Sequence, residues 1–321
     1  MAGRGHQGLT GALHRAVRGG KLSKNQRGEI RKDLPPRFLL ITKSKGEAYI
    51  VAQQRKPLIK VIVAGALGKV GSQMITGLAA DPELDLAGGA DPIASEEYRE
   101  LPGGGGLIPI TKAVGALITR VRPDVMVDFT HPASVMENVR VAISLGVRPV
   151  VGTTGLSPRD VNEISQSLEQ AGIGGVIAPN FATGANLLMY FARVAARFFP
   201  SAEIIEMHHD AKADAPSGTA LATARLMRDA RDEPMQDGPT ETFTLDGVRG
   251  GVEGGIRIHS VRLPGLVAHQ EIIFGGPGQL LTMRHDSMNR ESFVPGVALA
   301  VKEVMKQPGL IYGLDKIMGL A

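Results

Sequence analysis

The chain has 321 residues, 43% of them apolar, and carries a formal net charge of +4 without a single cysteine. This length is enough for two domains with hydrophobic cores, and no apolar run approaches the length of a membrane span. The absence of cysteine excludes disulfides, thiol nucleophiles and Cys-ligated zinc, and the eight histidines show no H-E-x-x-H spacing, so we expect no metal site. These features fit a cytoplasmic protein.

The basic excess lies entirely in residues 1–57. This segment has thirteen Lys and Arg against three Asp and Glu, a net of +10, so the rest of the chain carries −6. A mildly acidic body does not suit nucleic-acid binding. The segment fits a disordered basic arm, a targeting peptide or translated sequence upstream of the true start. We favour a dispensable extension and expect the first domain to begin at residue 58.

Residues 58–71 have the pattern of a dinucleotide-binding turn. An almost continuous apolar run, L-I-K-V-I-V-A, predicts a parallel strand buried on both faces, and it leads into G-A-L-G-K-V-G and a helix. Such a turn lets the backbone approach a pyrophosphate at the helix N-terminus. A second strand, at residues 84–90, ends in Asp91, where a carboxylate would meet the adenosine ribose. The spacing alone also fits an ordinary glycine turn of an α/β protein.

Later strands of this first domain end in small polar residues. Residues 149–151 and 176–178 are apolar, residues 125–129 are apolar except for Asp128, and the last two runs lead into G-T-T-G and P-N-F. The carboxyl ends of strands line the ligand crevice of a doubly wound sheet, so these loops would flank a nicotinamide, unless they are plain turns. Between the strands, His131 is expected to be structural or to line the cofactor site.

A second domain of mixed structure is expected to follow. A helix with apolar residues at helical spacing covers residues 184–199, and its Tyr190 and Phe191 are expected in the core. Alternating strands then predict a small open sheet covered by helices. These strands are expected at residues 203–207, 256–263, 267–274 and 280–285, and a last helix at 293–306 is expected to return to the first domain.

The densest group of proton carriers follows the first of these strands. His208, His209 and Lys212 lie within five positions, and Ser217 stands where a helix N-cap belongs. The N–H groups of residues 218–219 would then form an anion site at the helix N-terminus. This group suits a small, negatively charged substrate that must gain a proton. The alternative is a strand–loop–helix connection with surface histidines.

Taken together, five motifs resemble the 4-hydroxy-tetrahydrodipicolinate reductase (dihydrodipicolinate reductase) family of the diaminopimelate route to lysine. The motifs are the glycine turn at 65–71, D-F-T-H-P at 128–132, G-T-T-G at 152–155, A-P-N-F at 178–181 and H-H-D-A-K-A-D-A-P-S-G-T at 208–219. In this order they are highly specific, and the resemblance covers the chain from residue 58 to the C-terminus. A-R-F-F at 196–199, G-L-V-A-H-Q-E at 265–271 and S-F-V-P-G-V at 292–297 resemble the family's actinobacterial branch most closely.

The resemblance implies an α/β fold with an N-terminal Rossmann-type parallel sheet domain, at residues 58–181, completed by a C-terminal helix within 292–321. A central α+β domain with a mixed open sheet, at 182–291, would bind the substrate and form a homotetramer. The implied reaction is reduction of a cyclic imine dicarboxylate by NADH or NADPH after loss of water. Alternatives are another two-domain reductase acting on a different imine or carbonyl, or a non-catalytic NAD(P)-sensing module, which would have no use for the His208 group.

The resemblance also implies roles for individual residues. The proton donors and acceptors would be His208 and Lys212. The cofactor would be bound by Gly65, Ala66, Leu67, Gly68, Lys69, Val70, Asp91, Gly152, Thr153, Thr154, Ala178, Pro179, Asn180 and Phe181. The substrate carboxylates would be held by His209, Gly218 and Thr219, with help from Ser217.

Two positions depart from the pattern of some family members. Ala211 stands where some carry His, and Pro92 stands where some carry an Arg beside the acidic residue. The missing Arg removes the obvious partner of the 2′-phosphate of NADPH and leaves Lys69 as a substitute. We therefore expect NADH to be used at least as well as NADPH.

Overall fold

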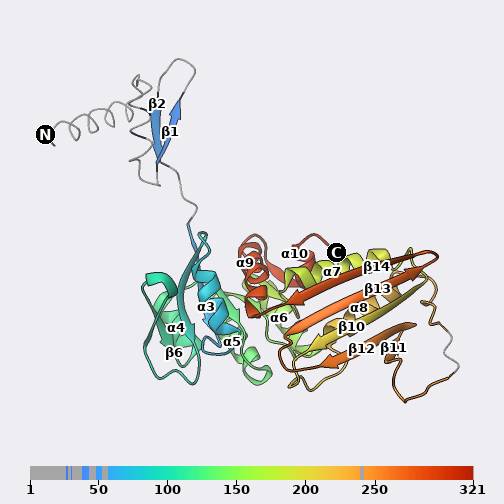
Figure 1. Cartoon of the computed structure of the whole chain (residues 1–321). Coiled ribbons are helices and arrows are strands. Elements are labelled where there is room, and N and C mark those ends of the chain that lie inside the picture. The colour runs from blue at the N-terminus through green and yellow to red at the C-terminus, as the bar shows by residue number, and fades with distance from the viewer. Residues whose placement is uncertain are drawn as a thin grey trace, which may run out of the picture. The chain divides into compact units, whose positions relative to one another are not determined.

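The computed structural model describes residues 27, 30, 38–42, 48–52, 57–238 and 242–320. The chain forms two compact units, 1–57 and 58–321. In the first, β1 (Phe38–Thr42) and β2 (Ala48–Ala52) pair as an antiparallel hairpin (Figure 1). The expectation of a disordered or dispensable extension concerns residues 1–57. Most of these residues lie outside the described ranges. No described helix combines the length and hydropathy that a membrane span requires.

The second unit begins with an eight-stranded sheet in the order β15-β9-β8-β7-β3-β4-β6-β5. All neighbours are parallel except β5 and β6. The strands are β3 (Ile59–Ala64), β4 (Leu84–Ala90), β5 (Tyr98–Glu100), β6 (Leu107–Thr111), β7 (Val125–Asp128), β8 (Arg148–Val151), β9 (Gly174–Ile177) and β15 (Gly309–Tyr312). The strand order reverses between β3 and β7, which is where open α/β sheets bind ligands. The predicted Rossmann-type sheet is confirmed.

Helices cover both faces of this sheet, which explains the apolar run in β3. Val61 and Val63 belong to a core cluster with α3 and α9, whereas Ile62 and Ala64 belong to a cluster with α4, α5 and α6. The helices are α3 (Gly71–Ala79), α4 (Val114–Val121), α5 (Pro132–Ser144), α6 (Pro158–Ala171), α9 (Val294–Glu303) and α10 (Leu314–Ile317), with short 3-10 turns η1 (Pro102–Gly104) and η2 (Arg290–Phe293). The C-terminal helix therefore returns to the first sheet as predicted, and β15, which the sequence analysis missed, adds an edge strand.

A five-stranded mixed sheet follows in the order β11-β12-β10-β13-β14. Only β10 and β12 run parallel to each other, and the other neighbours are antiparallel. The elements are α7 (Thr183–Ala195), β10 (Ser201–His208), α8 (Gly218–Asp229), β11 (Gly251–Glu253), β12 (Ile256–Arg262), β13 (Ala268–Gly276) and β14 (Gln279–Ser287). Helices α7 and α8 cover one face (Figure 1), where they share a core cluster with the strands. The predicted mixed open sheet is confirmed.

Candidate active site

A cavity of about 820 Å³ lies between the two sheets of the second unit. Thr154, Pro179 and Asn180 reach it from the loops after β8 and β9, at the carboxyl ends of parallel strands. The end of β10 contributes His208, and the loop to α8 and the first turn of α8 contribute Lys212, Asp214, Ser217, Gly218 and Thr219. The cavity therefore joins the predicted nicotinamide side to the predicted proton carriers.

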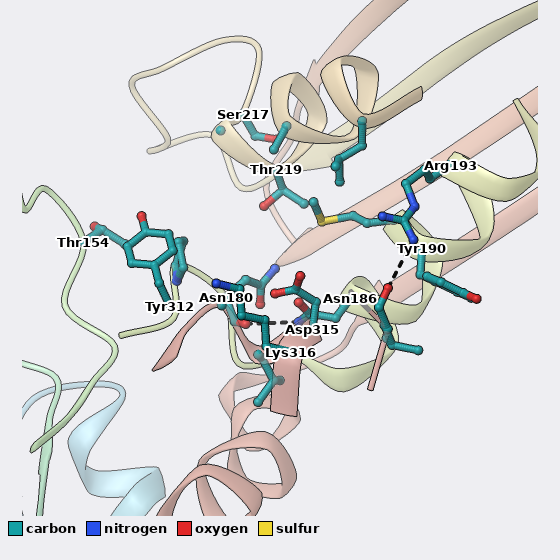
Figure 2. Close-up of a pocket in the computed structure, with 18 of the residues that line it drawn as sticks. Thr154, Asn180, Asn186, Tyr190, Arg193, Ser217, Thr219, Tyr312, Asp315 and Lys316 are labelled. Carbon is teal, nitrogen blue, oxygen red and sulfur yellow. Dashed lines mark hydrogen bonds between the residues drawn. The ribbon is translucent and has the colours of Figure 1, made fainter. Parts of the chain in front are cut away.

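The remaining lining comes from α7, α8 and the C-terminal segment. In Figure 2, Thr154 and Tyr312 lie at one end, Arg193 and Tyr190 lie at the other, and Asn180 lies between them. These remaining residues are Asn186, Met189, Tyr190, Arg193, Ala222, Leu226, Tyr312, Gly313, Leu314, Asp315, Lys316 and Leu320. The C-terminal segment thus closes part of the cavity wall.

The start of α8 forms one polar wall of the cavity. Ser217 has the extended backbone of an N-cap, and its Oγ accepts a hydrogen bond of 3.2 Å from the Ala220 N–H. Gly218 and Thr219 lie between Ser217 and Ala220 in the first turn of α8. Their N–H groups have no acceptor among residues 57–238 and 242–320. With the partial positive charge of a helix N-terminus, they form a place for an anionic group.

The two candidate proton carriers have different partners. Lys212 Nζ lies 2.7 Å from Asp214 Oδ1, and this hydrogen bond lowers the pKa of the Asp214 carboxyl. His208 Nδ1 lies 2.5 Å from Glu206 Oε2, and within the described part of the chain Nε2 has no hydrogen bond. Lys212 and His208 both line the cavity, so each presents a proton-carrying group to whatever binds there.

Glu206 is a fully buried carboxylate beneath this site. Arg262 donates to both of its oxygens, from Nη1 to Oε2 at 3.0 Å and from Nη2 to Oε1 at 2.8 Å. The Ser217 N–H also donates to Oε1, at 3.3 Å. Burial raises the pKa of Glu206, but hydrogen bonds from His208 and Arg262 outweigh it and lower the pKa to about 2. The carboxyl is therefore ionised at any pH near neutrality.

This carboxylate is expected to make the fold sensitive to acid. Because its pKa falls from 4.5 to about 2 on folding, its stabilisation is complete above about pH 4.5 and is lost as the pH drops towards 2. The shift corresponds to at most roughly 3 kcal/mol. We expect the difference in unfolding free energy between the wild type and Glu206→Gln to shrink across that range. Urea unfolding at pH 7, 4 and 3 measures it, and a constant difference would contradict the prediction.

The glycine turn after β3 has the geometry of a phosphate cradle. Gly65 has φ +78°, and a Cβ on Gly71 would lie 1.8 Å from the Gly65 carbonyl oxygen. The N–H groups of residues 65–68 all bond within the protein, whereas those of Lys69 and Val70 find no acceptor in the described ranges. The residues present thus fit a dinucleotide, with residues 69–70 offering the donors nearest to the start of α3.

Asp91 supports this turn directly. Its Oδ2 accepts from the Leu67 N–H at 3.0 Å and its Oδ1 from the Ile93 N–H at 3.2 Å, and the residue is only 7% exposed. From β5, Arg99 donates to the Ala66 carbonyl oxygen at 3.2 Å. A carboxylate and a guanidinium therefore contact the same turn, whereas the sequence predicted only a ribose contact for Asp91 and no role for Arg99.

Several predicted site residues lie outside the cavity. His209 does not line it, and the glycine turn and Asp91 lie elsewhere on the parallel sheet. Phe181 is buried in the core, with its ring edge-on to Phe129. Thr153 Oγ1 donates to the buried Asp128 at 2.7 Å and accepts from the Thr130 N–H at 2.8 Å, so it braces the strand ends. Gly152 and Ala178 likewise belong to these braced strand ends and not to the lining.

Other residues of the site were missed or misplaced by the sequence analysis. Tyr190 and Phe191 were expected in the core, but Tyr190 lines the cavity and Phe191 is half exposed, because this part of α7 faces away from the sheet. Glu206 did carry a signal, since it is a charged residue at an inward position of an alternating strand. Among the described residues, no group of three or more His, Cys, Asp or Glu is placed to hold a metal ion.

Two family models match consecutive parts of the chain. The dihydrodipicolinate reductase N-terminus model matches residues 59–181, and the dihydrodipicolinate reductase C-terminus model matches residues 184–318. Together they cover most of the second unit and meet between β9 and α7.

Individual relatives agree with these models. The 4-hydroxy-tetrahydrodipicolinate reductase of Dehalococcoides mccartyi is 47% identical over 262 residues, which cover 82% of this chain and 99% of the relative. The enzyme of the same name from Lysinibacillus sphaericus is 46% identical over 271 residues, covering 81% and 99%. A solved structure, the dipicolinate-bound dihydrodipicolinate reductase of Paenisporosarcina sp. TG-14, is 42% identical with a TM-score of 0.71, covering 81% and 99%. The chain therefore belongs to the dihydrodipicolinate reductase family.

Proposed function

We propose that the chain reduces 4-hydroxy-tetrahydrodipicolinate, by way of dihydrodipicolinate, to tetrahydrodipicolinate with NADH or NADPH, in the diaminopimelate route to lysine. One observation carries the proposal beyond family membership. A single cavity brings strand-end residues of the Rossmann-type sheet, such as Thr154 and Asn180, together with His208, Lys212 and the α8 N-terminus.

The polar wall of the cavity suits a dicarboxylate ring. The N–H groups of Gly218 and Thr219 and the ammonium of Lys212 offer positive charge on one side. The relative from Paenisporosarcina is described as dipicolinate-bound, which is a ligand of this class. We assign one substrate carboxylate to the α8 N-terminus, with Ser217 holding that turn in place. His209 does not line the cavity, so its proposed contact with a substrate carboxylate requires that its side chain turn towards the ligand.

The cofactor half of the site is proposed on the Rossmann-type sheet. The glycine turn at residues 65–70 would hold the pyrophosphate, Asp91 the ribose, and the loops at 152–154 and 178–181 the nicotinamide side. When bound, the nicotinamide supplies a hydride to ring C4 of the substrate. Lys212 and His208 hold protons on the opposite side of the cavity, where the neighbouring ring carbon must gain one. The α8 N-terminus stabilises charge as it develops.

A coupled assay tests the activity. The substrate is unstable, so a synthase that forms it from its precursors is added, and oxidation of NADH is followed by the loss of nicotinamide absorbance. We expect turnover that depends on both the synthase and this chain. NADH oxidation that does not respond to the synthase product, but does respond to another imine or carbonyl, would overturn the proposal.

The adenosine end leads to a prediction about cofactor preference. Asp91 suits a free 2′-hydroxyl and repels a 2′-phosphate, and Pro92 supplies no cation. Lys69 and Arg99 are the cations near the same turn. We therefore expect both cofactors to be accepted, with kcat/KM for NADH at least equal to that for NADPH. Steady-state kinetics with each cofactor measures the ratio, and a strong preference for NADPH would contradict this assignment.

The N-terminal extension is expected to be dispensable. The relatives match this chain over 99% of their own length while covering about 82% of it, and residues 58–321 form one compact unit. We propose residues 58–181 as the cofactor domain, 182–291 as the substrate domain and 292–321 as the returning helix. The open face of the mixed sheet is proposed to form a homotetramer. Light scattering should show the same number of subunits for the full chain and for residues 58–321, and the coupled assay should show the same turnover. Lost activity on deletion would overturn this view.

A further inference from the structure

Strand β10 carries a charged side chain where its pattern calls for an apolar one. Ala202, Ile204 and Glu206 all point to the covered face of the mixed sheet, and Ile204 and Glu206 are both fully buried. An ionised carboxylate is costly to bury unless hydrogen bonds and an opposite charge compensate it. Glu206 has both, and three of its partners, His208, Arg262 and Ser217, belong to the candidate active site or adjoin it.

The first partner is His208, two residues further along the same strand. A carboxylate only accepts hydrogen bonds, so the 2.5 Å contact between His208 Nδ1 and Glu206 Oε2 requires the proton to be on Nδ1. Nε2 is then the ring nitrogen that can exchange a proton with a ligand in the cavity that His208 lines. The carboxylate thereby selects which nitrogen does the chemistry.

The second and third partners fix the loop that carries Lys212. Arg262, on the neighbouring strand β12, binds both oxygens of Glu206, and its Nη2 also donates to the Asp214 carbonyl oxygen at 2.6 Å. At the other end of the loop, the Ser217 N–H donates to Glu206 Oε1. One buried carboxylate is thus connected to the imidazole, to the middle of the loop and to the N-cap of α8.

We propose that Glu206 is a positioning residue for the reaction: through His208 Nδ1 it sets the tautomer and orientation of the imidazole, and through Arg262 and Ser217 it holds the loop that presents Lys212. The inference rests on the proposed function for its kinetic part only, because the tautomer is a property of the protein without substrate. Replacing the outer hydrogen-bond partner of a metal-ligating histidine typically changes activity by about 10- to 100-fold. Glu206 orients a proton-carrying histidine in the same way, and we expect an effect of this order on kcat.

The decisive variant is Glu206→Gln. Arg262 can only donate, so it will hold the amide oxygen and turn the amide NH₂ towards His208 Nδ1. That nitrogen must then accept, and the proton moves to Nε2. Nitrogen-15 NMR of histidine-labelled protein over a range of pH, with His208 assigned by its loss in His208→Gln, should show Nδ1–H in the wild type and Nε2–H in the variant. Glu206→Asp, which keeps the carboxylate, should keep Nδ1–H.

The chain supplies a matched control on the same strand. Glu203 pairs with His259 Nε2 at 2.7 Å and with Arg249 Nη2 at 2.7 Å, but it points to the opposite face of β10. Glu203→Gln therefore removes a similar carboxylate–histidine–arginine group without touching the cavity. Because Glu203 lies on the face proposed for the homotetramer, the variant is compared with the wild type at the same oligomeric state, checked by light scattering. We expect it to leave kcat within about twofold and the His208 tautomer unchanged.

A double-variant cycle separates positioning from general loss of structure. If Glu206 acts through His208, Glu206→Gln should lower kcat by 10- to 100-fold in the wild type but much less in the His208→Gln background. A His208 tautomer that is the same in the wild type and in Glu206→Gln, or equal losses in both backgrounds, would overturn the inference. Should Glu206→Gln fail to fold, a wild-type spectrum without a proton on Nδ1 would overturn it equally. Absence of wild-type turnover alongside the expected spectra would instead count against the proposed function.

Discussion

Replacing Lys212 by alanine is expected to lower kcat by about 10²- to 10³-fold. Lys212 lines the cavity together with the first turn of α8, where the proposed substrate carboxylate binds, and its removal takes away both a proton and a positive charge. General acid catalysis and electrostatic stabilisation of this kind each contribute on the order of 10²-fold or more. The coupled assay at saturating cofactor measures the loss. We expect His208→Gln to fall in the same range.

The matched control is Lys316→Ala. Lys316 lines the same cavity from α10, yet it belongs to the C-terminal wall and not to the loop between β10 and α8. Its removal is expected to change kcat by no more than a few fold. NADH binding should survive in both variants, because neither side chain touches the glycine turn. Near-full turnover of Lys212→Ala, or an equal loss in Lys316→Ala, would remove Lys212 from the catalytic role.

The second large effect is expected at Gly71. An alanine there would place its Cβ 1.8 Å from the Gly65 carbonyl oxygen, so the turn must open and the donors at Lys69 and Val70 must move. Overpacking of this kind costs about 1–3 kcal/mol, which corresponds to a roughly 10- to 100-fold weaker affinity for NADH if the cost falls on the binding-competent turn. Fluorescence titration with NADH measures it.

Gly115→Ala, on α4 and outside the turn, is the companion control. Its Cβ would lie 3.3 Å from Val141 Cγ1, a contact that a shift of a few tenths of an ångström relieves. We expect the affinity of this variant for NADH to stay within a few fold of the wild type, and thermal unfolding to show that both variants are folded. Equal affinities of the Gly71→Ala variant and the wild type would mean that the turn does not hold the cofactor.

The parts of the fold that could be predicted are those set by local pattern. The apolar run of β3 followed by its glycine turn needs only a few adjacent residues, and so does the Ser217 cap of α8. The pairing of Glu206 with Arg262 joins residues 56 positions apart and depends on β10 and β12 being neighbours, which no local pattern reveals. The same holds for Lys316 in the cavity wall.

Burial is the other property that the sequence left open. Phe181 and Thr154 both follow strand ends at which cofactor contacts were predicted, but the chain turns Phe181 into the core and Thr154 into the cavity. His208 and His209 are adjacent, and only the first lines the cavity, because consecutive residues at a strand end point in opposite directions. A motif names the region of a site, and the backbone direction decides which of its side chains reach the ligand.

The most direct test of this account is a crystal structure of the chain with an oxidised nicotinamide cofactor and dipicolinate bound together. We expect the dicarboxylate ring to lie between C4 of the nicotinamide and the side chains of His208 and Lys212, with one carboxylate on the α8 N-terminus. A complex in which these two side chains lie far from C4 and point into solvent would contradict the account.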